Sequence, residues 1–260
     1  MPYADFVGLI NQWNVLPGAY NTLSKWAVYG RIDKTSRILE VACTTGFSSR
    51  ELSIMTGCKG VGFDVSKLAV SRARYNQKKY AKTNRISYLH ADGKLFNAEG
   101  KFSHIIVGAS LKFFSNPEII LKKCNQWLLD GGYLLASPFY TTRAIPDQLL
   151  KKARSVFGIT PTTATYKEIL ASYRNYEIIF EEQNTITQET PEEIADYCDA
   201  TVTRACDMLK IQDARVRNAL YNRIHAVRAM SNELRPYQKY VVLVLRYRRS
   251  TYPYRYVELF

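Results

Sequence analysis

The sequence predicts an α/β fold built on a mostly parallel, doubly wound sheet of seven strands. Short apolar runs alternate with helical stretches along the first half of the chain, which is typical of right-handed β-α-β crossovers. Four consecutive runs end on an acidic residue or on small residues, and in a parallel sheet such ends share one edge, where ligands bind. With 260 residues, 47% of them hydrophobic, the chain is long enough for one such domain with additions.

The first strand, turn and helix carry the strongest local signal. An apolar run at 38–41 follows a turn-prone stretch, and a helix is expected from Phe47. The small-residue turn at 43–46 allows backbone N–H groups to approach a ligand beside a helix N-terminus. Glu40 is costly to bury unpaired, so we expect it to meet a donor, which could be a ligand. Many α/β proteins carry a similar unit that binds nothing.

The second and third strands also lead to acidic residues. Asp64 closes the apolar run at 58–64, and Asp92 follows the run at 85–89. An acid after the second strand accepts hydrogen bonds from ribose hydroxyls in dinucleotide-binding folds. Asp64 could instead cap the helix expected at 67–80, although the serine two residues later can do so equally well.

The fourth strand is expected at 101–107 and leads to the small residues Gly108–Ser110. A helix beginning at Pro117, with an asparagine as its N-cap, precedes the fifth strand at 133–137. Two further strands are expected at 176–180 and 240–246, and further helices at 145–157, 166–173, 191–209 and 211–232.

The first 34 residues are rich in aromatic side chains and predict two short helices. Aromatic stripes at helical spacing usually reflect packing. A helical leader can also fold back across the ligand-facing end of the first strand. In that case Tyr20, Trp26 and Tyr29 would be lid residues, and we expect Tyr20 and Trp26 to contact the substrate.

The charge and cysteine content narrow the possible classes of function. The formal net charge of +13 fits either an anionic partner such as RNA or a solvated basic surface. Five scattered cysteines without C-x-x-C spacing argue against a disulfide framework and a zinc site, and they favour a cytoplasmic location. No apolar run approaches the roughly 18 residues of a membrane span, and the first residues do not predict a secretory signal.

The order and spacing of these elements resemble the class I, Rossmann-like S-adenosylmethionine-dependent methyltransferases over residues 35–140 and, more weakly, to residue 249. The resemblance implies S-adenosylmethionine as cofactor, with its methionine part in the first loop. It implies that Asp64 binds both ribose hydroxyls, that Asp92 holds the adenine amino group, and that Gly108–Ser110 face the sulfonium and the substrate. The cofactor-binding residues are then expected to be Glu40, Ala42, Cys43, Thr44, Gly46, Asp64, Val65, Asp92, Gly93, Gly108 and Ser110.

The first loop departs from the pattern of that family. Ala42 and Thr44 stand where the family's E/D-x-G-x-G-x-G motif has glycines. We therefore expect the loop backbone to avoid positive φ at both positions. Thr44 or Thr45 could instead hydrogen-bond the amino acid part of the cofactor.

Almost sixty residues separate the last two expected strands, which pair antiparallel in the family. We interpret them as a helical cap that selects the substrate, with His225 as its candidate substrate contact. The stretch 181–200 holds seven acids and no Lys or Arg, which indicates either a solvated helix start or a pocket for a cationic substrate. The expected division is an N-terminal helical lid at 1–34, an α/β core at 35–182 and 239–249, a cap at 183–238, and a basic aromatic tail at 250–260.

The sequence therefore predicts a methyltransferase for a small-molecule or peptide acceptor, with N-methylation of a cationic amine, as in natural-product biosynthesis, as the preferred case. An RNA methyltransferase is the alternative, supported by the net charge and the tail. A non-catalytic binding module of the same fold is a third possibility. The chain lacks the D/N-P-P-aromatic motif of adenine-amino enzymes and the Pro-Cys pair of cytosine-carbon enzymes. No metal is expected, no general base is assigned, and the oligomeric state is open.

Overall fold

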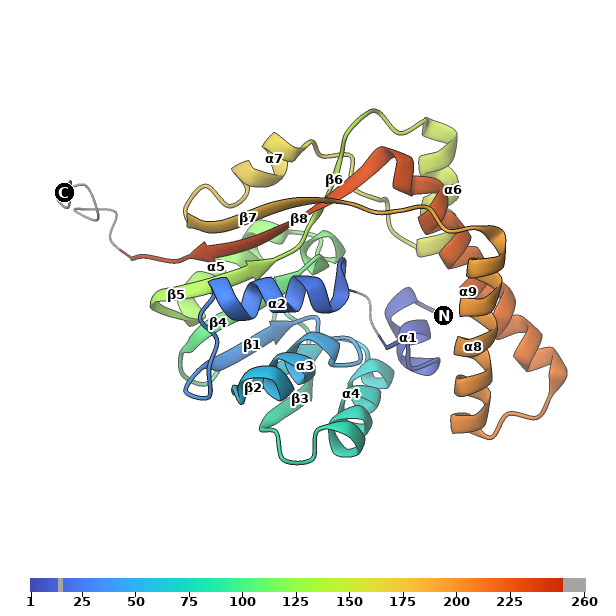
Figure 1. Cartoon of the computed structure of the whole chain (residues 1–260), viewed down its shortest axis with the longest axis horizontal. Coiled ribbons are helices and arrows are strands. Elements are labelled where there is room, and N and C mark those ends of the chain that lie inside the picture. Colours follow the sequence, from blue (N-terminus) through green and yellow to red (C-terminus); the bar gives the residue numbers. More distant parts are fainter. Residues whose placement is uncertain (14–15, 250–260) are drawn as a thin grey trace.

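The computed structural model describes residues 1–13 and 16–249, so the tail at 250–260 lies outside the described residues. Its centre is an eight-stranded sheet (Figure 1). The strands are β1 (Arg37–Val41), β2 (Lys59–Asp64), β3 (Ile86–His90), β4 (Phe102–Gly108), β5 (Leu128–Ala136), β6 (Phe139–Thr141), β7 (Glu177–Thr185) and β8 (Gln238–Arg246).

The sheet follows the order β3-β2-β1-β4-β5-β8, and β1 to β5 pair in parallel. β8 runs antiparallel to β5, and β7 pairs antiparallel with β8 along its other edge. This confirms the doubly wound, mostly parallel sheet. The strand count differs by one, because the short β6 continues the line of β5 along β8.

Helices cover both faces of this sheet. They are α1 (Tyr3–Leu9), α2 (Ala19–Tyr29), α3 (Phe47–Thr56), α4 (Lys67–Tyr80), α5 (Pro117–Trp127), α6 (Asp147–Phe157), α7 (Tyr166–Ala171), α8 (Pro191–Leu209) and α9 (Ala214–Leu234), with short 3-10 turns η1 (Ser110–Phe113) and η2 (Arg235–Tyr237). Successive residues of a strand point to opposite faces. Accordingly, Ile105 joins the core that contains α5, while Ile106 joins the core that contains α2, α3 and α4.

The helical hairpin of α8 and α9 lies at one end of the sheet, and α1 lies between it and α4 (Figure 1). Phe6 and Ile10 pack into the apolar cluster of α8 and α9. On the opposite side, Gly8 touches α4 so closely that an added Cβ would lie 2.4 Å from the backbone nitrogen of Ala69. The first helix therefore joins the hairpin to the α/β core.

Candidate functional site

The strand ends that the sequence singled out border one cavity of about 1710 Å³. Glu40, Asp64 and Asp92 all line this cavity, and so do Gly108 and Ser110. These residues come from the carboxyl ends of β1 to β4, which the parallel topology brings to one edge. The expectation that the three carboxylates share one hollow is thus met, and their roles toward a ligand stay proposals.

The loop after β1 corrects one expectation directly. The backbone has positive φ at Ala42 (54°), Thr44 (46°) and Gly46 (76°), so the first two residues do not avoid the left-handed region. Hydrogen bonds hold this conformation: the Cys43 N–H donates to the Phe63 carbonyl at 2.9 Å, and the Gly46 N–H donates to the Cys43 carbonyl at 2.7 Å. The loop backbone is fixed by β2 and by its own turn rather than by glycine content.

Tyr88 supports this loop from beneath. Its hydroxyl donates to the Gly46 carbonyl at 3.0 Å and lies 3.1 Å from the Ser49 hydroxyl. A Cβ on Gly46 would lie 2.6 Å from the Tyr88 ring, so only glycine fits there. Cys43 and Gly46 are not among the described residues lining the cavity, whereas Ala42 and Thr44 are.

Asp64 is held by two backbone amides. The Thr44 N–H donates to Oδ2 at 3.0 Å, and the Ser66 N–H donates to Oδ1 at 2.8 Å. Ser66 itself caps α4 by accepting from the Ala69 N–H, so capping does not occupy Asp64. Burial raises the pKa of Asp64, while the two amides lower it. Because a carboxylate offers about four acceptor positions, about two stay available on the cavity side for hydroxyl donors.

Glu40 finds its donor inside the chain. The Ser49 N–H at 3.1 Å and the Ser49 hydroxyl at 2.5 Å both donate to Oε2. Burial raises the pKa of the Glu40 carboxyl above its ordinary value, and the Ser49 hydrogen bonds oppose the shift. Glu40 thus orients the start of α3 while it lines the cavity.

Asp92 and Gly93 line the cavity beside aromatic walls. Asp92 Oδ1 accepts from the Lys94 N–H at 2.8 Å, which closes the turn after β3. A Cβ on Gly93 would lie 2.8 Å from the Phe114 ring and 3.3 Å from the Phe63 ring, and Val65 also lines the cavity. A flat apolar group next to a carboxylate fits this wall. Phe114 was not expected from the sequence, because it follows a turn with no periodic pattern.

The N-terminal candidates require a correction. Trp26 of α2 is fully buried in the core. The Tyr20 hydroxyl donates to the Glu51 carboxylate at 3.2 Å. Neither residue is among the described residues that line the cavity. Tyr3 of α1 does line it, with its ring stacked against Phe113 of η1. The N-terminal side of the cavity is therefore formed by the start of α1 and by residues 16–18, which lead into α2.

The candidate from the cap also requires a correction. His225 stacks on Tyr221 and is not among the described lining residues, whereas Arg228, one turn further along α9, is. None of the seven acids between 181 and 200 lines the cavity either. Several have partners within the chain: Glu182 pairs with Lys25, Glu189 with Arg228 and Arg235, and Glu193 completes the capping box of α8.

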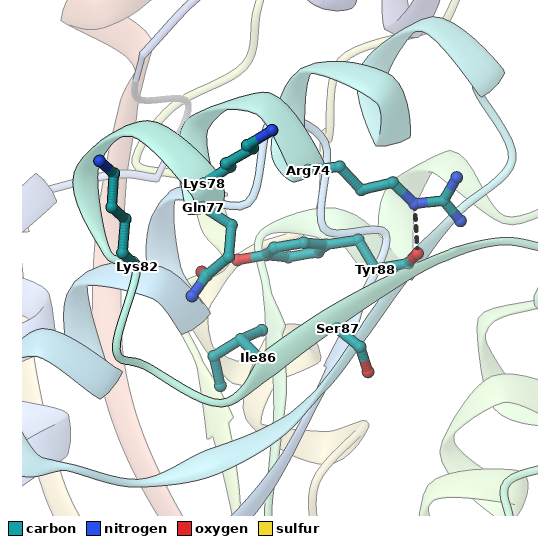
Figure 2. A pocket seen from close by; sticks show the side chains of 7 residues that line it. All are labelled: Arg74, Gln77, Lys78, Lys82, Ile86, Ser87 and Tyr88. Atoms are coloured by element: carbon teal, nitrogen blue, oxygen red, sulfur yellow. Dashed lines mark hydrogen bonds between the residues drawn. The ribbon is translucent and has the colours of Figure 1, made fainter.

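A second, more open hollow of about 670 Å³ lies between α4 and β3 (Figure 2). Its described lining holds Arg74, Lys78 and Lys82 and no carboxylate. Arg74 is engaged through Nε, which donates to the Tyr88 carbonyl at 2.9 Å. This hollow shares none of the strand-end acids and is separate from the candidate site.

Comparisons with known proteins agree with this geometry. A family model described as a methyltransferase domain matches residues 39–136, the segment that contains all four strand ends. MccD is similar to this chain, with 27% sequence identity and a TM-score of 0.74 over 90% of this chain and 100% of MccD. Residues 39–136 form a methyltransferase domain of the class I, S-adenosylmethionine-dependent type.

Two further proteins are similar to this chain, one in its fold and one over a short segment. An S-adenosylmethionine-dependent methyltransferase from Geobacter sulfurreducens, solved with S-adenosyl-L-homocysteine, has a TM-score of 0.72 at 16% identity, covering 95% of this chain and 99% of that one. The sterol 24-C-methyltransferase of Clavispora lusitaniae is 36% identical over 61 residues, which make up 24% of this chain and only 16% of that enzyme. The cofactor of a methyltransferase domain of this type is S-adenosylmethionine. None of its described helices is long and apolar enough to cross a membrane.

Proposed function

We propose that this methyltransferase transfers a methyl group from S-adenosylmethionine to a nucleophilic atom of a small molecule, leaving S-adenosylhomocysteine. One observation carries the proposal: a single cavity joins the strand-end residues Glu40, Asp64 and Asp92 to Arg228 and Arg235 of the helical cap. Ligand sites are typically concave, apolar and few per protein, and they have a small number of convergent polar groups. A cavity closed by three parts of the chain favours a compact acceptor.

The residues present fit the cofactor. Asp64 retains acceptor positions for two ribose hydroxyls, and the wall of Phe63, Val65 and Phe114 beside Asp92 suits an adenine ring. The positive-φ loop turns its backbone toward the cavity, where the amino acid part would lie. The remaining proposed contacts named from the sequence are Glu40, Ala42, Thr44, Gly93, Gly108 and Ser110. Cys43 and Gly46, which do not line the cavity, would act by shaping the loop.

The chain's contribution to the reaction is mainly positioning. The cofactor supplies its own leaving group and an electrophilic methyl, so transfer is an in-line displacement that needs no catalytic triad. Ser110 donates to the Val107 carbonyl at 2.7 Å and so holds the end of β4 toward the cavity. The Tyr3 ring contacts both Phe113 and Phe157 at the lid side, where the three rings reduce access of water.

The acidic stretch lends no support to a cationic amine as the acceptor, because its acids lie away from the cavity lining. An amine acceptor without a net positive charge remains within the proposal, and so does a short peptide acceptor. A natural-product pathway and a cytoplasmic location are part of the same proposal. The cap over the cavity favours a small acceptor over a folded RNA, and no observation of the described site favours RNA.

A screen with radiolabelled S-adenosylmethionine tests this function. Pools of small metabolites, short peptides and total RNA are incubated with the full chain, and label transferred to each pool is counted. We expect transfer to the metabolite or peptide pool and its loss in Asp64→Ala. Label in RNA alone, or no cofactor binding by calorimetry, would contradict the proposal.

A further inference from the structure

The cap contributes an unexpected charge to the cavity. Its lining residues are Thr185, Ile186, Thr187, Arg228, Ser231, Leu234, Arg235 and Gln238. Within the described chain, this wall therefore carries two guanidinium groups and no carboxylate. The wall that the sequence suggested to be acidic is basic.

Both guanidinium groups form ion pairs with Glu189, a residue that does not line the cavity. Nε and Nη2 of Arg228 donate to Glu189 Oε1, the former at 3.2 Å, and Nη2 of Arg235 lies 2.8 Å from Glu189 Oε2. One carboxylate is therefore paired with two cations, and the only other acid acting on Arg235 among the described residues is Glu193, which does not line the cavity, so the wall itself is positively charged. Opposite charges on a ligand are attracted to such a wall.

The pair is fixed in place before any ligand arrives. Asn232 accepts from Nη1 of Arg235 at 3.1 Å and from the Glu189 N–H at 2.8 Å. The Arg228 guanidinium lies 4.3 Å from the ring centroid of Tyr197. Nη1 of Arg228 has no acceptor among the described residues, so the fork retains donors for a ligand. Planar, pre-oriented guanidinium groups suit carboxylates and phosphates.

Tyr3 of α1 adds a neutral donor near this pair. Burial raises the pKa of Tyr3 to about 12, with Tyr197 adding to the shift and Arg228 opposing it. The phenol therefore stays protonated at neutral pH and can donate a hydrogen bond.

We propose that Arg228 and Arg235 form an anion-binding subsite for the acceptor, so that the methylated small molecule carries a carboxylate or a phosphate group. This proposal rests on the proposed function, because it places the acceptor in the cavity beside the cofactor. Carboxylate and phosphate share the chemistry that the fork recognises, and experiment distinguishes them.

The test uses the full chain loaded with S-adenosylhomocysteine, titrated by calorimetry with inorganic phosphate and, separately, with acetate. We expect at least one of them to bind, and the tighter one identifies the group. Arg228→Gln should weaken binding roughly tenfold or more, since it removes a cation together with the charge-assisted donor at Nη1. Glu189→Gln should instead tighten binding several-fold, because it leaves both guanidinium charges uncompensated.

The two variants break the same ion pair with opposite expected signs, so general damage to the cap cannot mimic the result. Arg217→Gln is the matched control: it lies on the same helix, pairs with Asp199 at 3.8 Å and does not line the cavity. Binding of neither anion, equal weakening by Arg217→Gln, or weakening by Glu189→Gln would overturn the subsite. Failure of S-adenosylhomocysteine to bind would overturn the proposed function instead, and the same anion titrations on the unloaded chain would still decide the subsite.

Discussion

At the scale of single residues, the loop after β1 departs most from expectation. Ala42 and Thr44 adopt positive φ, a region that costs a residue with a Cβ roughly 1–2 kcal/mol. The sequence pattern records only which residues are present. It does not show that Phe63 and Asp64 of the neighbouring strand fix the amides of Cys43 and Thr44. Replacement of glycine in a motif therefore does not by itself predict a change of backbone conformation.

This strain leads to a stability prediction. Ala42→Gly should leave the free energy of unfolding unchanged or raise it by up to about 1 kcal/mol, because relief of strain offsets the greater entropy of the unfolded chain. Urea denaturation measures it. The control is Ala226→Gly on the exposed side of α9, expected to lose about 1 kcal/mol. Equal losses in the two variants would show that Ala42 is not strained.

Glu40 gives a prediction about pH. Burial raises the pKa of Glu40 above its ordinary value of 4.5, so the folded chain holds this proton to higher pH than the unfolded chain does. Its contribution to stability therefore falls as pH rises from about the ordinary value toward the raised one. Glu40→Gln removes this dependence, so the variant should gain stability relative to wild type as the pH rises above 4.5. A difference that stays constant over that range would contradict the assignment.

At the scale of elements, the first helix links three parts of the molecule. It contacts α4 through Gly8, the cap through Phe6 and Ile10, and the cavity through Tyr3. Asn11, just beyond it, exchanges two hydrogen bonds with Asn76 of α4, at 3.0 and 2.9 Å.

Gly8→Ala should therefore act on both stability and the site. The added methyl would collide with the backbone of α4, where neither partner can move easily, and overpacking of this kind costs about 1–3 kcal/mol. We expect a lower unfolding midpoint and weaker binding of S-adenosylhomocysteine, measured by thermal denaturation and calorimetry. An unchanged affinity would show that α1 does not hold the cavity closed.

Regular elements were predicted well where their pattern is long. Helices α4 and α8 have the bounds expected from periodicity and capping residues. The strand β6 was missed, because three residues after a proline carry no readable period. The sequence pointed to His225, whereas Arg228, one turn further along α9, lines the cavity. Helical spacing does not reveal this, because α9 has apolar and charged residues on several faces and its rotation is set by packing on the core.

At the scale of the whole molecule, the cavity exists because lid, core and cap close around one sheet edge. The sequence predicted the sheet edge and its three carboxylates, because strand ends in a parallel sheet have a fixed location. It did not predict the charge of the acceptor wall. The distribution of charge along the sequence does not show which acidic side chains pair with other residues of the folded chain. Glu189, Glu182 and Glu193 all have such partners.

The most direct test of the central claim is calorimetric titration of the full chain with S-adenosylhomocysteine, comparing wild type with Asp64→Ala. We predict binding to wild type and a loss of about 1–3 kcal/mol in the variant, roughly 5- to 150-fold in affinity, because ribose hydroxyls lose a charged acceptor. Asp199→Ala, an equal charge change outside the cavity, should bind as wild type does. Equal affinity of the Asp64→Ala and wild-type chains, or no binding to wild type, would contradict the account.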